Sequence, residues 1–405
     1  MDKPTDDLEM WRAGARELLP MAVALRRELH RFPELGLILP ETTRRAREAL
    51  AGLDVEIVEG KATSSLVVTL RGAQQGPTIL LRGDMDALPM PEDTELEFKS
   101  RNEGRMHACG HDSHTAMLVG AVHLLHKHRE RLNGNVKFFF QTGEEGHAGA
   151  RHAIEEGMLD AAPAPSAAFA IHISPNIPTG VIASRSGPLM AATDTIQIEV
   201  LGKGGHASQP HYTRDPIPAA CEIVTALQSL VTRRVEAFDP VVLSITKIEA
   251  GTTSNVVPES ARLLGTLRSF SDKSRATAKE GIARIAHGIA AAHELEAKVR
   301  LDEGYPVTVN DDGFVAFAQG VVTDLFGARG YLKMPAPVMG AEDFSYVLQK
   351  MPGCMMFLGV APPDVSHHHA HACHSNRMVM DEDAMASGIA LHAAIAERYL
   401  SKPPA

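Results

Sequence analysis

The sequence predicts an α/β fold into which a smaller α+β domain is inserted. Two observations indicate this. At both ends of the chain, apolar strand patterns alternate with helical patterns, which is typical of a sheet covered by helices. Between them, residues 188–300 have the order strand, helix, strand, strand, helix, strand, which is the order of a ferredoxin-like unit. We therefore expect a discontinuous larger domain, residues 1–187 and 301–405, and an inserted domain, residues 188–300.

The first part of the chain begins with an amphipathic helical pattern over about residues 8–30, which ends before Phe32-Pro33. A strand at 78–82 is almost wholly apolar, so we expect it to lie in the centre of the sheet. The other expected elements are strands at 65–70, 136–141 and 167–172 and helices at about 114–131 and 150–156.

In the inserted part, residues 195–200 alternate apolar and polar side chains, as a strand with one exposed face does. The next helix begins near Asp215-Pro216, because proline is tolerated in a first turn. The remaining expected elements are strands at 241–248, 262–268 and 297–300, a helix at 273–293, and, after Tyr305, a helix at 311–326, a strand at 355–359 and a final helix at about 382–399. Two chain connections between domains suit a hinge and a cleft.

Composition excludes several classes of protein. The chain has 405 residues, 44% hydrophobic and 22% charged, and a formal net charge of -10, which is typical of a soluble two-domain protein. Without a block of lysine and arginine we expect no nucleic-acid binding, and without an apolar run of about 20 residues we expect no membrane span. The acidic N-terminal residues and the four cysteines, none in a Cys-x-x-Cys pair, favour a cytoplasmic protein.

Two segments carry the pattern of a metal-dependent hydrolase. Cys109 and His111 are separated by one residue, and Glu144-Glu145 follows a strand-like run. Thiolate, imidazole and carboxylate are all ligands of zinc and similar cations. Adjacent residues that leave a strand point in different directions, so one carboxylate can bind metal while its neighbour accepts a proton from water. Cys-x-His alone is more often part of an ordinary turn, but the combination favours metal-assisted hydrolysis.

Five residues are candidate ligands of two metal ions: Cys109, His111, Glu145, His172 and His374. His172 follows an apolar strand, although an isolated histidine there is more often an ordinary buried one. His374 precedes the final helix, and the histidines at 367, 368, 369 and 371 are rivals that can chelate metal loosely. Glu144 is then left to act as general base.

Other polar residues have more open interpretations. Asp86, like Asp84, follows a buried strand, and it is a candidate to hold the ring N–H of a ligand imidazole, with turn capping as the alternative. In the inserted domain, His206 and Asn255 lie in turns and are candidate oxyanion donors or ordinary turn residues. Arg268 can pair with a substrate carboxylate or remain a solvated charge.

Taken together, these segments resemble the metallopeptidase family that groups aminoacylases with glutamate carboxypeptidases. Within it they are similar to the amidohydrolase branch of hippurate hydrolases, N-acyl-amino-acid amidohydrolases and plant enzymes that cleave auxin–amino-acid conjugates. The resemblance covers essentially the whole chain, and its motifs begin at Arg26, Arg82, Met106, Thr142, Gly202 and Gly340.

The resemblance implies a zinc-peptidase-like catalytic domain with an inserted ferredoxin-like lid that often mediates dimerisation. It implies two divalent ions, zinc or manganese, with cobalt or nickel able to replace them in vitro. It assigns the five candidate ligands to metal, Glu144 to general base, and His206 and Asn255 to oxyanion stabilisation, and it does not make Asp84 a ligand. The histidine run before His374 departs from the family pattern.

The expected substrate is an N-acyl or N-aroyl amino acid, which is cleaved to a carboxylic acid and a free amino acid. The alternatives are N-acetyl-diaminopimelate deacetylase or dipeptidase activity and, in another class, a catalytically silent binding protein. Glu144 beside Glu145 argues against a silent protein, because a binding module needs no general base. We also expect a homo-oligomer formed through the inserted domain.

Overall fold

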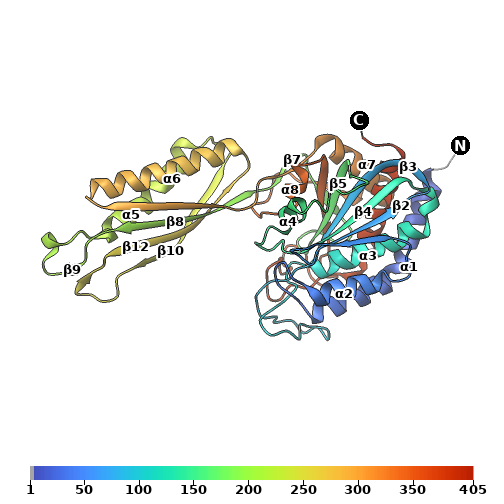
Figure 1. Ribbon diagram of the computed structural model, residues 1–405, viewed down its shortest axis with the longest axis horizontal. Coiled ribbons are helices and arrows are strands. Elements are labelled where there is room, and N and C mark those ends of the chain that lie inside the picture. Colours follow the sequence, from blue (N-terminus) through green and yellow to red (C-terminus); the bar gives the residue numbers. More distant parts are fainter. Residues whose placement is uncertain (1–3, 405) are drawn as a thin grey trace. The chain divides into compact units, whose positions relative to one another are not determined.

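The computed structural model describes residues 4–404 of the chain (Figure 1). The chain divides into two compact units. The larger consists of the described residues up to Leu189, Val309–Ala336 and the described residues from Asp343 onward; the smaller consists of Met190–Thr308 and Pro337–Glu342. Two short strands, β7 (Gly187–Met190) and β14 (Thr308–Asn310), lie where the chain passes from one unit to the other.

The larger unit contains an eight-stranded sheet with the order β1-β2-β4-β3-β5-β16-β6-β15. In its centre, β4, β3, β5 and β16 run parallel to one another. The strands are β1 (Glu56–Glu59), β2 (Leu66–Arg71), β3 (Gln74–Asp84), β4 (Asn133–Gln141), β5 (Ala167–Ser174), β6 (Ile182–Ser184), β15 (Tyr331–Lys333) and β16 (Gly353–Gly359). Every residue of β3 from Thr78 to Asp84 is buried, as expected for a central parallel strand.

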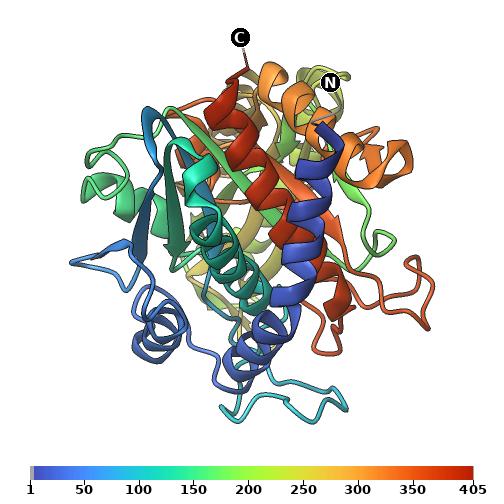
Figure 2. The same cartoon turned by 90° about the vertical axis from the view of Figure 1, so that its right-hand side faces the viewer.

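Three long helices, α1 (Pro4–Arg31), α3 (His111–Lys127) and α9 (Met385–Ser401), pack side by side in the larger unit (Figure 2). Glycine permits their close approach, since a Cβ on Gly14 would lie 2.5 Å from Leu124 and one on Gly120 would lie 2.6 Å from Ile389. The other helices of this unit are α2 (Pro40–Ala49), α4 (Gly149–Glu155), α7 (Asp312–Phe326) and α8 (Ser345–Leu348).

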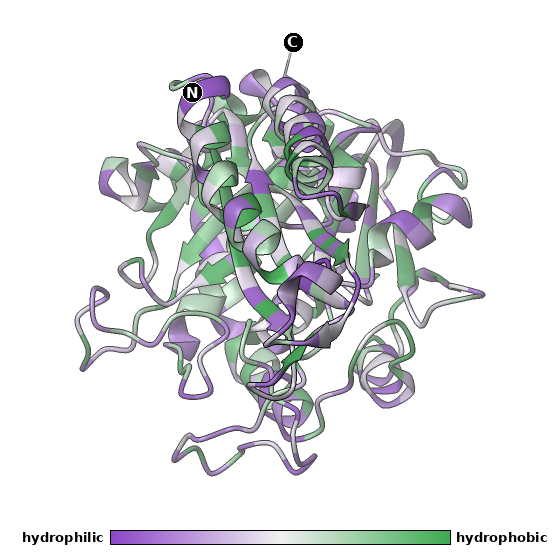
Figure 3. Cartoon of the chain, turned by 90° about the vertical axis from the view of Figure 1, so that its left-hand side faces the viewer, coloured by the Kyte–Doolittle hydropathy of each residue, from purple (hydrophilic) through white to green (hydrophobic). Residues whose placement is uncertain are grey.

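The apolar core of the larger unit lies between these helices and the sheet. Phe138, Phe140 and Phe169 are fully buried there, next to apolar side chains of α1, α3 and α9. In Figure 3 green, hydrophobic segments are visible along strands, and much of the length of the loops is purple or pale. None of the described helices is both long and apolar enough to cross a membrane.

The smaller unit has a four-stranded antiparallel sheet with the order β10-β12-β8-β13. Its strands are β8 (Ala192–Leu201), β10 (Val241–Ala250), β12 (Ser260–Ser269) and β13 (Glu296–Glu303), with β9 (Gly205–His206) and β11 (Val256–Val257) as a separate pair. The helices α5 (Pro216–Arg234) and α6 (Asp272–Ala292) pack on the sheet over a core that includes Ile196, Ile198 and Leu267. This is the ferredoxin-like order, and the predicted fold class is confirmed.

The α/β sheet determines where polar residues gather. Because β4, β3 and β5 are adjacent and parallel, their carboxyl ends meet at one edge of the sheet. Asp84 ends β3, the loop after Gln141 carries Glu144 and Glu145, and His172 lies near the end of β5. This edge is therefore the place at which Asp84, Glu144, Glu145 and His172 come together from separate segments.

The loop into α3 shows one difference from the sequence expectation. The helix begins at His111, not near residue 114, and ends at Lys127. Gly110 adopts φ 83°, the left-handed region that favours glycine, and Asp112 places a negative charge in the first helical turn, where the helix dipole favours it. As a result His111 is held by the helix, while Cys109 remains in the loop before it.

Candidate metal centre

All five predicted ligands lie in the larger unit, in loops, at the start of helix α3 and in strand β5. Cys109 and His111 flank Gly110 at the start of α3. Glu145 lies in the loop after β4, and His172 is in β5. His374 lies in the segment between β16 and α9, and its backbone N–H donates to the carbonyl of Ala108 at 2.8 Å. That hydrogen bond joins the His374 segment directly to the Cys109 loop.

A first group of ligand atoms comes from Cys109, His111 and His172. These atoms lie within 4.8 Å of one another, and all three residues are buried. The Sγ atom of Cys109 is 3.3 Å from Nε2 of His172. The group therefore combines one thiol with two imidazoles, which is a typical ligand set for a borderline-soft divalent cation.

A second group consists of Cys109, Glu145 and His374, again with ligand atoms within 4.8 Å of one another. The Nε2 atom of His374 is 3.2 Å from Oε1 of Glu145, and the His374 side chain is 55% exposed. His374 has φ 68°, which is uncommon for a residue other than glycine. Because Cys109 belongs to both groups, the five side chains form two ligand sets that share one thiol.

The surroundings of His111 fit a bound cation. Both ring nitrogens are buried, and neither has a hydrogen-bond partner among residues 4–404. Three carboxylates lie near them: Nε2 is 3.5 Å from Asp84 and 4.0 Å from Glu145, and Nδ1 is 3.6 Å from Asp86. Burial favours the neutral ring, but the negative charges of Asp84 and Asp86 outweigh it and raise the pKa of His111 to about 10. A divalent cation would balance these acidic groups in the same way.

The other ligand candidates have shifted pKa values with identifiable causes. The neighbouring Cys373 and burial raise the pKa of the Cys109 thiol, so it needs a nearby cation to ionise. Burial and the neighbouring His114 hold the pKa of His172 well below its ordinary value, which keeps its imidazole neutral, the form that binds metal. Burial opposes ionisation of Glu145, yet the hydrogen bond to His374 lowers its pKa.

Glu144, the predicted general base, is 6% exposed and lies beside the ligand sets. A carboxylate oxygen of Glu144 lies within 4.8 Å of ligand atoms of His111 and Glu145. Its backbone N–H donates to Oδ1 of Asp86 at 3.0 Å, and the N–H of Glu145 donates to Oδ2 at 2.9 Å. Asp86 therefore fixes the backbone of both glutamates, in addition to lying near His111.

Asp84 has a different set of partners. Its carboxylate forms an ion pair with Arg82 at 2.6 Å and accepts a hydrogen bond from Nδ1 of His114 at 2.6 Å. The sequence interpretation did not include His114, which lies one helical turn after His111 and is 1% exposed. The available signal was its spacing of three residues from a candidate ligand on the same helix.

The remaining predicted residues lie in the smaller unit. His206 is in β9, and Ala207 next to it donates its N–H to the carbonyl of Asn255 at 3.0 Å, so these two candidate donors belong to one pair of turns. Nδ1 of His206 accepts hydrogen bonds from the backbone and hydroxyl of Ser208. Arg268, on β12, is half-buried, its guanidinium has no partner among residues 4–404, and burial lowers its pKa.

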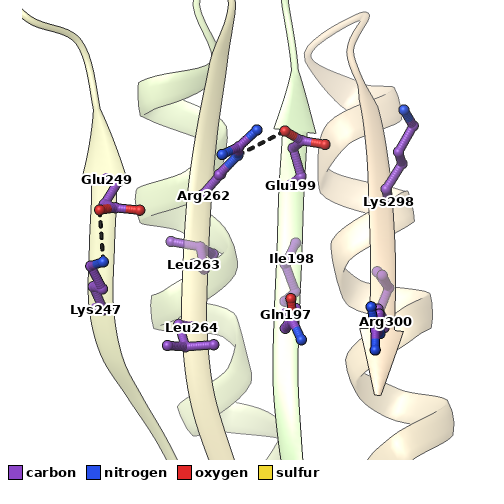
Figure 4. Close-up of a pocket in the computed structure, with 11 residues that line it drawn as sticks. Gln197, Ile198, Glu199, Lys247, Glu249, Arg262, Leu263, Leu264, Lys298 and Arg300 are labelled. Atoms are coloured by element: carbon purple, nitrogen blue, oxygen red, sulfur yellow. Dashed lines mark hydrogen bonds and ion pairs between the residues drawn. The ribbon is translucent and has the colours of Figure 1, made fainter. Parts of the chain in front are cut away.

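The open face of the four-stranded sheet has a hollow of about 470 Å³ (Figure 4). Its charged side chains are largely paired, with Arg262 2.9 Å from Glu199 and Lys247 2.7 Å from Glu249. It contains none of the predicted site residues, so we do not regard it as the reaction site.

The histidine run before His374 does not form a ligand group in the described part of the chain. None of His367, His368, His369 and His371 belongs to a group of three side chains close enough to hold one ion, whereas His374 does. Asn176 instead holds this segment, by donating to the carbonyls of His367 and Ala370.

An α/β unit with a thiol–imidazole–carboxylate cluster at the ends of its parallel strands, in a chain that also contains a ferredoxin-like unit, defines a metal-dependent hydrolase. The chain belongs to peptidase family M20/M25/M40, whose model matches residues 80–398. The family resemblance inferred from the motifs is thereby confirmed, and the protein is a metal-dependent amidohydrolase of this family.

Individual relatives cover nearly the whole chain. Thermostable carboxypeptidase 1 of Saccharolobus solfataricus is 37% identical, over 98% of this chain and 100% of its own length. The IAA-amino acid hydrolase ILR1-like 4 of Arabidopsis thaliana is 38% identical, over 96% and 88%. The solved structure of the Bacillus subtilis YXEP protein, a dinuclear metal binding peptidase from the M20 family, is 34% identical with a TM-score of 0.82, covering 95% of this chain and 99% of that one.

Proposed function

We propose that the protein hydrolyses the amide bond of an N-acyl or N-aroyl amino acid and releases a carboxylic acid and a free amino acid. The observation that carries the proposal is the position of Glu144. A buried carboxylate that lies beside these two ligand sets and belongs to neither is placed to accept a proton.

Two divalent ions would be held by Cys109, His111 and His172 on one side and by Cys109, Glu145 and His374 on the other. Bound there, the ions would polarise the amide carbonyl and make a water molecule more acidic. The thiolate and imidazole ligands favour zinc, with manganese as the second candidate and cobalt or nickel as replacements in vitro. The similarity to a dinuclear metal binding peptidase supports two ions.

In this account Glu144 accepts the proton of the attacking water and returns it to the leaving amine. Its carboxylate is well placed for both transfers because Asp86 fixes the backbone on which it is carried. The 6% exposure of Glu144 also keeps bulk water from competing for that proton.

We further propose that the smaller unit acts as a lid and supplies the groups that bind the substrate. His206 and Asn255 would stabilise the negative charge that develops on the carbonyl oxygen. Nε2 of His206 has no partner among the described residues, so it is available as a donor. Arg268 would pair with the substrate carboxylate, and the unpaired, half-buried state of its guanidinium supports this role.

The assembly and compartment are proposals as well. We propose that copies of the chain form a homo-oligomer through the smaller unit, where β10 is an edge strand with Val242 and Ile248 exposed. We propose a reducing compartment such as the cytoplasm, because all four cysteines are free and one is a candidate ligand.

Amine release from a panel of N-acetyl, N-benzoyl and N-indoleacetyl amino acids, with and without chelator, tests the proposal. We expect turnover of at least one acyl class, abolished by chelator and restored by zinc or manganese. Absence of turnover in every class with a fully metallated protein would refute it.

Peptide cleavage is the second candidate, and the 37% identity to a carboxypeptidase favours it. Dipeptides and N-acetyl-diaminopimelate belong in the same panel, because they share the metal chemistry and differ only in what the binding groups contact. Faster cleavage of these compounds than of simple N-acyl amino acids would select this alternative. Metal binding without turnover of any compound would select the catalytically silent protein.

A further inference from the structure

Two imidazoles of the larger unit are linked through a single residue of β5. Nε2 of His114 accepts the backbone N–H of Ile173 at 2.9 Å, and the carbonyl of the same Ile173 accepts Nδ1 of His172 at 2.6 Å. Both histidines are buried, with side chains 1% and 8% exposed. Ile173 therefore connects His114, which is not one of the five predicted ligands, with His172, which is.

These hydrogen bonds determine the tautomer of each ring. Because Nε2 of His114 accepts the Ile173 N–H, it carries no proton, so Nδ1 holds the proton and donates it to Asp84 at 2.6 Å. Because Nδ1 of His172 donates to a carbonyl, Nε2 of His172 keeps its lone pair, which faces Sγ of Cys109 at 3.3 Å.

Asp84, which accepts the Nδ1 proton of His114, is itself held in place by other residues. Arg82 lies 2.6 Å from its second carboxylate oxygen, and Thr115 donates its hydroxyl to the Asp84 carbonyl at 2.8 Å. Gly83 lets α3 approach β3 closely, since a Cβ there would lie 2.9 Å from the carbonyl of His114. The carboxylate therefore has one orientation, with one oxygen directed at His114.

We propose that Asp84 and His114 are positioning residues that act through Ile173 to fix the metal-binding tautomer and orientation of His172. This inference rests on the proposed metal centre and adds residues to it that are not ligands. Substitution of a residue that orients a ligand imidazole without binding the metal generally weakens metal binding by about 10–100-fold. A buried histidine–aspartate pair with a purely structural role would change the free energy of unfolding and leave metal affinity unaltered.

Two substitutions break the hydrogen bonds that link Asp84, His114, Ile173 and His172, each at a different point. In His114→Asn the amide can still donate to Asp84, but the side chain is too short to place its oxygen where Nε2 of His114 accepts the Ile173 N–H. In Asp84→Asn the new amide N–H donates to Nδ1 of His114, so the ring proton moves to Nε2. The Nε2–H and the Ile173 N–H are then two donors that face each other without an acceptor. Asn310→Asp is the matched control, because Asn310 is equally buried in the larger unit and its amide bridges Ser184 and Met355, away from the ligand groups.

The measurements are zinc affinity, by competition with a chromogenic chelator, and the tautomer of His172 in metal-free protein, by ¹⁵N NMR after histidine labelling. We expect zinc binding that is about 10–100-fold weaker in both variants, together with loss of the single His172 tautomer. We expect wild-type affinity in Asn310→Asp, even if its unfolding midpoint falls.

The outcomes separate this inference from the proposed metal centre. Zinc affinity within about twofold of wild type in His114→Asn would overturn the positioning role. Weaker binding with an unchanged His172 tautomer would overturn the route through Ile173. If Asp84→Asn does not fold, His114→Asn alone decides between these results. A wild-type protein that binds no zinc would refute the metal centre itself.

Discussion

The carboxylate of Asp86 accepts the backbone N–H of Glu144 at 3.0 Å. Its other oxygen accepts the N–H of Glu145, so the residue two places after the end of β3 holds both glutamates that follow β4. A predicted ligand and a predicted general base thus share one anchor. Asp86 holds the backbone of each glutamate and not its side chain, so either side chain can be substituted without releasing the other. The two roles can therefore be tested by separate mutations.

Cys109 is expected to be the more important of two neighbouring cysteines. It belongs to both ligand groups, whereas Cys373 belongs to no ligand group in the described residues and lies beside the Cys109 thiol and 3.9 Å from the carbonyls of Cys109 and Ile173. Cys109→Ser should lower metal occupancy at both positions, because a hydroxyl is a much weaker ligand than a thiolate. Cys373→Ser is the control and should be mild. If elemental analysis showed the greater loss of metal in Cys373→Ser, the proposed centre would be assigned to the wrong cysteine.

His374 should be the histidine of its segment that binds metal. It lies 3.2 Å from Glu145, while His371 belongs to no ligand group in the described chain. We expect His374→Ala to lose about one equivalent of tightly bound metal and His371→Ala to retain it. Equal losses in the two variants would mean that the histidine run binds the metal collectively.

His206 should contribute to turnover and not to metal binding. We expect His206→Ala to reduce kcat by about 10²–10³-fold, the range for one lost oxyanion donor, with metal content unchanged. Ser208→Ala is the control, since it removes a hydrogen bond to Nδ1 of His206 and leaves the ring in place. If His206 only braces its turn, both variants will lose thermal stability and keep kcat.

If the donor comes from a second copy of the chain, mixing His206→Ala with Glu144→Gln should restore some activity. Hybrid dimers would then contain one intact composite site. No recovery after verified subunit exchange would mean that each chain supplies its own donor.

Glu382 should make the stability of the larger unit depend on pH. It binds the buried Arg26 at 2.9 Å and also Arg27. Burial would raise the pKa of Glu382, but the hydrogen bond from Arg27 and the charge of Arg26 outweigh it and lower that pKa. A group with a lowered pKa stabilises the fold above its unfolded pKa, about 4.3 for glutamate, and loses that effect as pH falls through the folded pKa.

We therefore expect Glu382→Gln to lower the unfolding free energy at pH 7 by about 1.5–2 kcal/mol, as for the loss of charge-assisted hydrogen bonds at a partly buried site. The difference from wild type should shrink below about pH 4. Urea unfolding in chelator between pH 7 and pH 3 measures it. A difference that stayed constant over this range would show that the carboxylate charge is not what stabilises the contact.

The sequence predicted the elements whose side chains are chemically distinctive. The apolar runs of β3, β4 and β5 and the alternation in β8 identified the two sheets, and the ligand types at strand ends identified the edge at which they meet. It missed α2, because only three residues of that helix, Thr42, Thr43 and Ala46, are buried and no apolar stripe marks it. Strands as short as β6 and β15 carry no periodic pattern at all.

Within the site, the partners of the predicted residues were less predictable than the residues themselves. Asp86 was expected to hold a ligand imidazole, and its Oδ1 lies 3.6 Å from Nδ1 of His111. No sequence pattern reveals its two further hydrogen bonds, from the backbone N–H groups of Glu144 and Glu145. His114 was missed because a histidine inside an apolar helix is normally a core residue. Its partner Asp84 is 30 positions away and meets it only through the packing of α3 on β3.

The most direct test of the account concerns Glu144. Glu144→Gln keeps the size and hydrogen-bonding capacity of the side chain but cannot accept a proton. The variant and wild type should be compared by amine release from the best N-acyl amino acid, with metal content measured on the same samples. We predict unchanged metal content with turnover lower by about 10²–10⁴-fold. Near-normal turnover at full metal content would contradict the assignment of Glu144 as the proton acceptor and, with it, the proposed mechanism.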